Sequence, residues 1–197
     1  HVVGLHIDPT AKPMMEGLQS IRDGRLGRAR LVADVLQRMG IPGALEGALA
    51  LAPNETGFTL RAQPTIYWYV SEALTSPVEL TLSTTDPLKD AASPSLEIML
   101  QPPIAKGMHA LRLSEHGIAL KTGVEYQWFV AVVANPAQRS GDVVAGGAIK
   151  RVDADSVQIR LKEAPRSRWP AVYAESGIWY DALEELSREI SANPGDA

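Results

Sequence analysis

The hydrophobic pattern of this chain changes its period near residues 53–57, and this change determines the fold class that we expect. Before it, apolar residues recur at helical spacing, as between residues 32 and 39. After it, residues 78–83 alternate apolar and polar side chains, which is typical of a half-buried antiparallel strand. Helical spacing returns after residue 155. The pattern predicts an α+β chain with domains at residues 1–52, 53–154 and 155–197.

The middle of the chain is expected to form short strands separated by Pro and Gly turns. Strands at this spacing favour a β-sandwich. Residues 125–134 are the most hydrophobic of these segments and are predicted to be central. Gly146 and Gly147 indicate either a bulge or a close backbone approach. The strands are expected at residues 65–70, 78–83, 96–100, 108–113, 125–134 and 143–152.

Helices are expected on both sides of this β-domain. The N-terminal ones form a three-helix appendage, whose third helix covers residues 43–52. At the other end, two antiparallel helices meet at Gly177 and make a helical hairpin. The second of them carries a narrow apolar stripe, which must pack on the sandwich, on a partner or on a second copy. The C-terminal helices are predicted at residues 155–161, 169–176 and 179–192.

The composition excludes several classes of protein. With 45% hydrophobic and 21% charged residues, the chain is ordinary globular material. A formal charge of −4 and a pI near 5.6 give no general affinity for nucleic acid, which favours basic surfaces. The chain has no cysteine, so disulfides and thiolate chemistry are excluded. Its longest apolar run, at residues 129–134, is too short for a transmembrane segment.

Four motifs connect the larger part of the chain to a known family. They are GFTL at residues 57–60, PTIYWYV at 64–70, GVEYQW at 123–128 and YAESGIWYDAL at 173–183. Over about residues 51–196 the chain resembles domain-of-unknown-function family 928, an uncharacterised bacterial family. The resemblance implies an Ig-like antiparallel β-sandwich with a C-terminal helical segment, in a periplasmic or exported protein. It implies no catalytic residues.

A shorter resemblance covers residues 1–52. The segments that carry it are HVVGL at residues 1–5, RAR at 28–30 and IPGALEGA at 41–48. They resemble part of the PHP-domain metal-dependent phosphoesterases, in particular the RNase AM-type 5′-3′ exoribonucleases. This resemblance implies a cytoplasmic protein in which His1 is a ligand of Mn, Fe or Zn and nucleic acid is the substrate.

The rest of that metal site has no counterpart in the sequence. Phosphodiester hydrolysis by clustered metals needs several His and carboxylate ligands that converge on one site. The family's opening His-x-His motif and its later His and Asp motifs are not matched. The chain has only four histidines, which are His1, His6, His109 and His116. One ligand cannot hold a catalytic cluster, so the alternative to an enzyme is a segment that no longer has the chemistry.

Aromatic residues mark the candidate interaction surface. Trp169, Tyr173, Trp179 and Tyr180 crowd the helical hairpin, and such residues often anchor interfaces. The competing interpretation, which we favour, is that they dock the hairpin onto the sandwich. The consecutive aromatics at residues 67–69 could stack on a ligand, but core packing is the simpler interpretation.

Charged residues cluster near the C-terminus without forming a recognisable site. Asp181, Glu184 and Glu185, with Glu175, form an acidic group. General acid–base work needs two carboxylates in a cleft, whereas Glu184 and Glu185 are predicted to lie on a solvated helix face. A basic group could bind phosphate or an acidic partner, but the acidic chain makes it unspecific. That group comprises Lys150, Arg151, Lys162, Arg166 and Arg168.

Two functions follow from these observations. The first is a non-catalytic structural or protein-interaction module of the cell envelope, without cofactor or catalytic residues, which binds a protein partner or a second copy. The alternative is an incomplete metal-dependent phosphoesterase or exoribonuclease of the PHP type. Only in this alternative are a divalent metal and nucleic acid expected.

Overall fold

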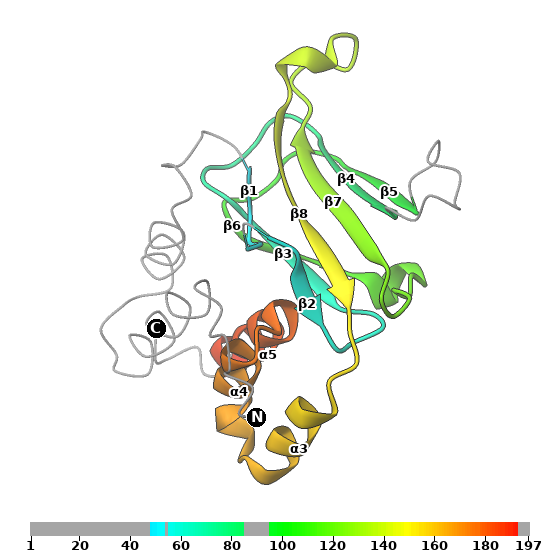
Figure 1. Cartoon of the computed structure of the whole chain (residues 1–197). Coiled ribbons are helices and arrows are strands. Elements are labelled where there is room, and N and C mark those ends of the chain that lie inside the picture. Colours follow the sequence, from blue (N-terminus) through cyan, green and yellow to red (C-terminus); the bar gives the residue numbers. More distant parts are fainter. Residues whose placement is uncertain (1–47, 54, 85–94, 193–197) are drawn as a thin grey trace. The chain divides into compact units, whose positions relative to one another are not determined.

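The computed structural model describes residues 48–53, 55–84 and 95–192. The described residues divide between two compact units, one within Pro42–Asp153 and one that contains the C-terminal segment from Ala154. Together they form a mixed α+β structure with two sheets and three α-helices (Figure 1). The predicted N-terminal helices at residues 1–47 lie outside the described residues.

Eight described strands form the first unit. The small sheet has the antiparallel order β1-β3-β6, and the large sheet has the order β2-β8-β7-β4-β5. All six segments predicted as strands are strands. Their bounds are β1 (Ala48–Ala50), β2 (Gly57–Thr59), β3 (Thr65–Val70), β4 (Val78–Thr84), β5 (Leu96–Leu100), β6 (Gly107–Arg112), β7 (Glu125–Val132) and β8 (Val143–Arg151).

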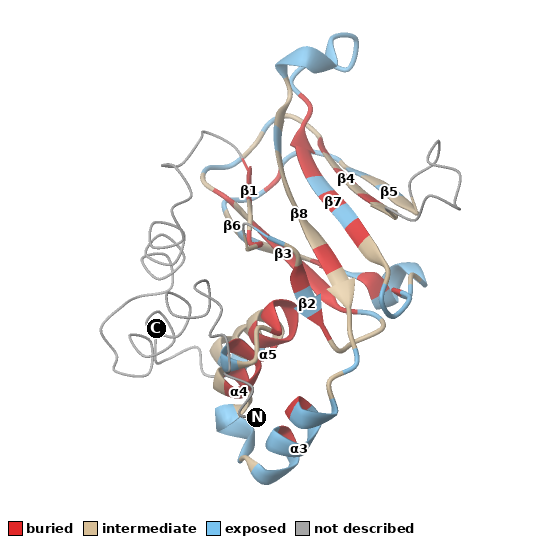
Figure 2. Cartoon of the chain, in the orientation of Figure 1, coloured by how far each residue is buried: buried red, intermediate tan, exposed pale blue. Residues whose placement is uncertain are grey.

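The large sheet has β7 at its centre, as its hydrophobicity predicts. Side chains alternate between the two faces of a strand, so every second residue faces the core. On β7 these are Tyr126, Trp128 and Val130, all buried (Figure 2). Trp128 and Val130 pair with Leu82 and Leu80 of β4, which are also buried, so the inner face of the large sheet is continuous core in these two rows.

Gly147 allows the two sheets to approach closely beside β1. A Cβ atom at this position would stand 2.4 Å from the Cβ of Ala52 and 3.4 Å from Nε1 of Trp128. The pairing of β8 with β7 runs without interruption through Gly146 and Gly147. The prediction of a close backbone approach is therefore confirmed, and the alternative of a bulge is wrong.

Two short strands depart from the sequence-based expectation. Ala48–Ala50 forms β1, so the predicted helix at residues 43–52 is wrong for these three residues. Alanine and leucine favour helix locally, but here β3 supplies an antiparallel partner, and tertiary context overrides propensity. Gly57–Thr59, not predicted as a strand, forms β2 and pairs in parallel with β8.

The second unit contains the three described helices, close to their predicted bounds. They are α3 (Asp155–Glu163), α4 (Trp169–Glu175) and α5 (Trp179–Ala192), and α4 contacts both of the others. Gly177 ends α4 with a φ of 72°, a left-handed conformation that only glycine adopts at little cost. The predicted turn at this glycine is confirmed.

Candidate interaction surfaces

The outer face of the large sheet is defined by the strand register. Val144, Ala131 and Glu79 lie side by side in one cross-strand row, with Met99 at its end. The next row contains the β7 residue two positions before Ala131, and it begins with Gly146 and Phe129. In full, the second row is Gly146, Phe129, Thr81 and Glu97, and the third is Ala148, Gln127 and Ser83.

The centre of this outer face is apolar or neutral. Phe129 is 41% exposed there, and Val144, in the adjacent row, is 55% exposed. Charged side chains lie at the margins, where Lys150 is paired with Glu125 across the strands and Glu97 stands on the outermost strand. Interfaces between proteins commonly have such an aromatic centre without charges and a polar rim.

Glu79 is the charged residue nearest to this centre, and it is neutralised. Arg139, in the loop between β7 and β8, forms ion pairs with Glu79 and Asp142. Hydrogen bonds to Asp142 and then to Glu79 raise the pKa of Arg139, so the guanidinium stays charged at every physiological pH. The Glu79 side chain is largely buried beneath this contact.

The Phe129 ring lies close to the backbone of the neighbouring strand at Gly146. Atom Cδ1 of the ring is 2.5 Å from the place where a Cβ of residue 146 would stand, which only a glycine permits. The ring therefore covers the Gly146 backbone and still keeps two fifths of its surface exposed. A large, partly exposed aromatic side chain of this kind is well suited to contact a partner.

The hydrophobicity of residues 125–134 did not predict that Phe129 is exposed, although its position in the strand indicates this. Phe129 has the same strand parity as Glu125 and Gln127, which are polar, and the opposite parity to Tyr126 and Trp128. Strict alternation therefore places its ring on the solvent face. The high hydrophobicity of the whole segment concealed this.

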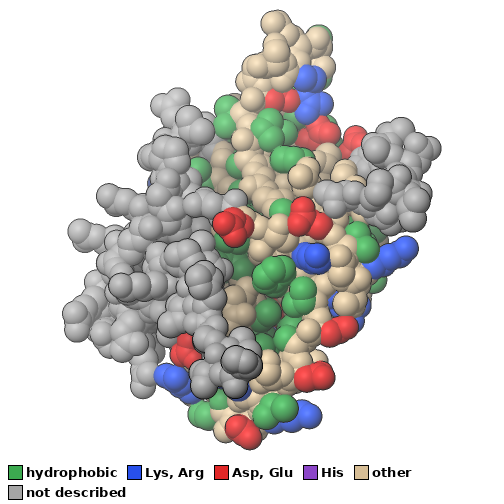
Figure 3. All heavy atoms as spheres, viewed as in Figure 1, with side chains coloured by type: hydrophobic (Ala, Val, Ile, Leu, Met, Phe, Trp, Pro, Cys, Tyr) green, Lys and Arg blue, Asp and Glu red, His purple; other side chains and the backbone are tan. Residues whose placement is uncertain are grey.

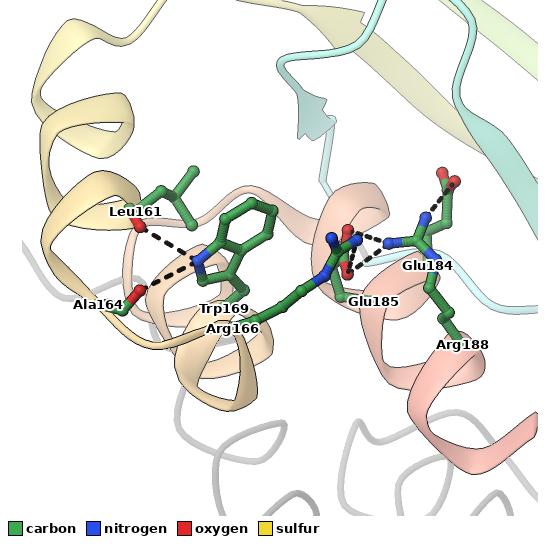
Figure 4. A network of polar contacts seen from close by, with 7 residues as sticks. All are labelled: Leu161, Ala164, Arg166, Trp169, Glu184, Glu185 and Arg188. Carbon is green, nitrogen blue, oxygen red and sulfur yellow. Dashed lines mark hydrogen bonds and ion pairs between the residues drawn. The ribbon is translucent and has the colours of Figure 1, made fainter. Parts of the chain in front are cut away.

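The four aromatic residues proposed as an interaction surface lie in the second unit. Tyr173, Trp179 and Tyr180 are buried, and Trp169 is half-buried. The indole N–H of Trp169 donates hydrogen bonds to the carbonyl oxygens of Leu161 and Ala164, at 3.1 and 3.4 Å (Figure 4). Trp169 therefore ties the end of α3 to the start of α4, and its role as a partner contact stays a prediction.

The acidic group of α5 differs from the expected solvated face. Asp181 and Glu185 are buried. Arg188 donates hydrogen bonds to both carboxylate oxygens of Glu185, at 2.7 and 2.6 Å, and Arg166 lies 3.8 Å away (Figure 4). The prediction of a solvated helix face is therefore wrong for Glu185, because a carboxylate tolerates burial when cations pair with it.

Two residues of the predicted basic group, Arg166 and Arg168, contact carboxylates of the second unit, whereas Lys150 and Arg151 lie on β8 of the first unit. Arg166 also lies over the Trp169 ring, 5.0 Å from its centroid, and Arg168 is 3.9 Å from Glu175. One turn beyond Glu185, burial and the Glu185 charge raise the pKa of Glu189. On the face in Figure 3, acidic and basic side chains are interspersed over the described part of the chain, without a continuous basic surface.

The histidines within the described residues have packing or surface roles. His109 stacks on Trp68 with ring centroids 5.3 Å apart, and its Nε2 is 2.7 Å from the Ala105 carbonyl oxygen. His116 is exposed in a short 3-10 helix after β6. No group of three or more potential metal ligands occurs within residues 48–53, 55–84 and 95–192. His1, the predicted ligand, lies outside them.

Comparison with known proteins identifies one family over most of the chain. The family model described as "Domain of Unknown Function (DUF928)" matches residues 41–197. This match includes β1, which the sequence pattern had assigned to the N-terminal segment. Among the described helices, none combines the length and hydropathy that crossing a bilayer would require.

Shorter matches connect about a quarter of the chain to phosphoesterases. The chain is 46% identical over 54 residues to a 3',5'-nucleoside bisphosphate phosphatase of Chromobacterium violaceum, which covers 27% of this chain and 19% of the relative. It is 50% identical over 52 residues to the 5'-3' exoribonuclease Rnm of Escherichia coli, which covers 26% and 18%. The chain thus spans about a fifth of the length of these relatives.

Proposed function

The chain belongs to the DUF928 family, and we propose that it acts as a non-catalytic protein-interaction module. The interaction surface is the outer face of the large sheet. The observation that carries this proposal is Phe129, an aromatic ring that lies beside the Gly146 backbone and is 41% exposed at the uncharged centre of that face. Buried aromatic anchors supply most of the binding energy of protein interfaces, whereas charged rims mainly exclude wrong partners.

We also propose that the first unit is an Ig-like sandwich. The antiparallel run β8-β7-β4-β5, with β2 added in parallel to β8 and β1-β3-β6 as the second sheet, supports it. Further support comes from Tyr126, whose hydroxyl accepts a hydrogen bond of 3.2 Å from the backbone N–H of Lys121. Many Ig-like domains have a tyrosine near the start of one strand, and its hydroxyl makes a hydrogen bond of this kind to backbone a few residues upstream. That the C-terminal helices pack on the sandwich as a hairpin stays a prediction.

Site-directed photo-crosslinking tests the interaction surface. A photoreactive phenylalanine analogue is placed at Phe129 in the full chain within its host, and at Met108 as the control. Met108 is also an exposed apolar residue, 45% accessible, but it lies on β6 of the small sheet. We expect one protein to crosslink from residue 129 and not from residue 108. Equal crosslinking from both positions, or from neither, would contradict the proposal.

A second candidate function is an incomplete metal-dependent phosphoesterase or exoribonuclease of the PHP type. The identity of 46–50% over 52–54 residues to a phosphatase and an exoribonuclease favours it. In this candidate His1 would be one ligand of Mn, Fe or Zn, and the metal would supply an activated water for hydrolysis of a phosphodiester of nucleic acid.

Metal analysis and a hydrolysis assay separate the two functions. The full chain is purified after growth with added Mn, Fe and Zn, and its metal content and hydrolysis of bis(p-nitrophenyl) phosphate are measured. An interaction module predicts substoichiometric metal and a hydrolysis rate equal to that of the His1→Ala variant. Stoichiometric metal, together with turnover that His1→Ala abolishes, would instead establish the enzyme.

A further inference from the structure

β5 is an edge strand of the large sheet. Within residues 48–53, 55–84 and 95–192, β4 is the only strand that pairs with it. Natural edge strands commonly carry Pro, Lys, a bulge or an inward-facing charge that prevents pairing with another chain. β5 consists of Leu96-Glu97-Ile98-Met99-Leu100, pairs regularly with β4 and has none of these features. Among the described strands none pairs with the other edge of β5, which is therefore suited to accept a further strand.

The inward-facing side chains of β5 are incompletely covered. Leu96, Ile98 and Leu100 face the same side of the sheet as the inner residues of β4, yet all three are only half-buried. The β4 residues opposite them are at most 3% exposed. A strand added beside β5 would cover the remaining apolar surface of these three residues, which is favourable at about 25 cal/mol per Å².

We propose that the added strand is β5 of a second copy of this chain, paired antiparallel so that the two large sheets become continuous. A two-fold symmetric contact requires a strand that is complementary to itself. A slip of one residue would turn the side chains to the opposite faces, so only registers that keep the faces aligned are allowed.

Among these registers, pairing centred on Ile98 is the most favourable. It pairs all five residues and places Leu96 opposite Leu100 and Glu97 opposite Met99. Centring the contact on Glu97 would bring two carboxylates face to face, which is destabilising. Centring it on Met99 would pair only three residues of the strand. The strand is thus self-complementary in its apolar contacts, and this register places no two carboxylates directly opposite each other, which favours a second copy as the partner.

The contact is small, so the dimer is expected to be weak. Five residues a side bury less area than a standard interface, which corresponds to dissociation constants of roughly micromolar to millimolar. Sedimentation equilibrium of the full chain, up to near-millimolar concentration, is the suitable measurement. We expect a reversible monomer–dimer equilibrium.

A charge substitution and its rescue test the register. Met99→Glu places a carboxylate opposite Glu97 of the second copy, twice by symmetry, and should raise the dissociation constant at least about tenfold. Adding Glu97→Lys to this variant makes both contacts attractive and should restore dimerisation. Met108→Glu, on the small sheet, is the control and should leave dimerisation unchanged.

Three results would overturn the inference. They are a wild-type chain that remains monomeric at the highest concentration, a Met99→Glu variant that dimerises as the wild type does, and a double variant that is not rescued. The inference does not depend on the proposed function, because Val144 and Phe129 lie on β8 and β7, away from the β5 edge. A Val144→Glu chain should dimerise normally whether or not the outer face binds a partner.

Discussion

Replacing Trp179 with alanine is expected to lower the free energy of unfolding by about 3–5 kcal/mol. Trp179 begins α5 and is 5% exposed, so the substitution removes a large buried ring and leaves a cavity. The cost combines the lost burial of apolar surface with the loss of packing contacts around the cavity. Chemical denaturation of the full chain, followed by circular dichroism, measures this change.

The control lies in the same helical unit. Ile159, on α3, is 55% exposed, so Ile159→Ala should change the free energy of unfolding by less than about 0.5 kcal/mol. If Trp179→Ala leaves stability unchanged but abolishes self-association, Trp179 serves an interface instead. That result would also support the predicted role of the aromatic residues of this segment as an interaction surface.

Gly147→Ala is expected to destabilise the chain by about 2–3 kcal/mol, near the upper end of the usual cost of overpacking. The added Cβ would stand 2.4 Å from the Cβ of Ala52, well inside van der Waals contact. The Trp128 indole, whose Nε1 would be 3.4 Å from the new Cβ, restricts the adjustments that could relieve the clash. Equilibrium denaturation gives the value, and no change in stability would contradict the close approach.

The identity of the clashing atom can be tested by a second substitution. Ala52→Gly removes the Cβ that the new methyl group would meet, so the double variant should regain part of the stability lost in Gly147→Ala. Residues in contact show such coupling, whereas distant residues have additive effects. Strict additivity would mean that Ala52 does not make this contact.

Most strands could be predicted because each carries a local signal. Residues 78–84 alternate in polarity, and residues 65–70 are aromatic and β-branched, so pattern and structure agree. The strands at Ala48–Ala50 and Gly57–Thr59 carry no such signal. Three residues are too few to establish a period, and their pairing partners are distant in sequence. These strands depend on tertiary context.

The candidate surfaces were less predictable than the fold. Burial of Glu185 depends on Arg188, one turn away, and on Arg166 from outside the helix, so a charge pattern along α5 alone suggests solvation. Exposure of Phe129 follows from its strand parity, but the place of its ring beside the backbone depends on Gly146 of the neighbouring strand. A surface assembled from several strands requires the register, which periodicity in one segment does not specify.

The dissociation constant of the partner crosslinked at residue 129 is the most direct test that the chain acts through the outer face of the large sheet. It is measured by titration calorimetry for the full wild-type chain, Val144→Glu and the control Met108→Glu. Both substituted residues are exposed and apolar, at 55% and 45%, so each variant should keep its fold. We predict that Val144→Glu raises the dissociation constant at least about tenfold and that Met108→Glu changes it less than about twofold. Equal dissociation constants for the two variants would contradict the account.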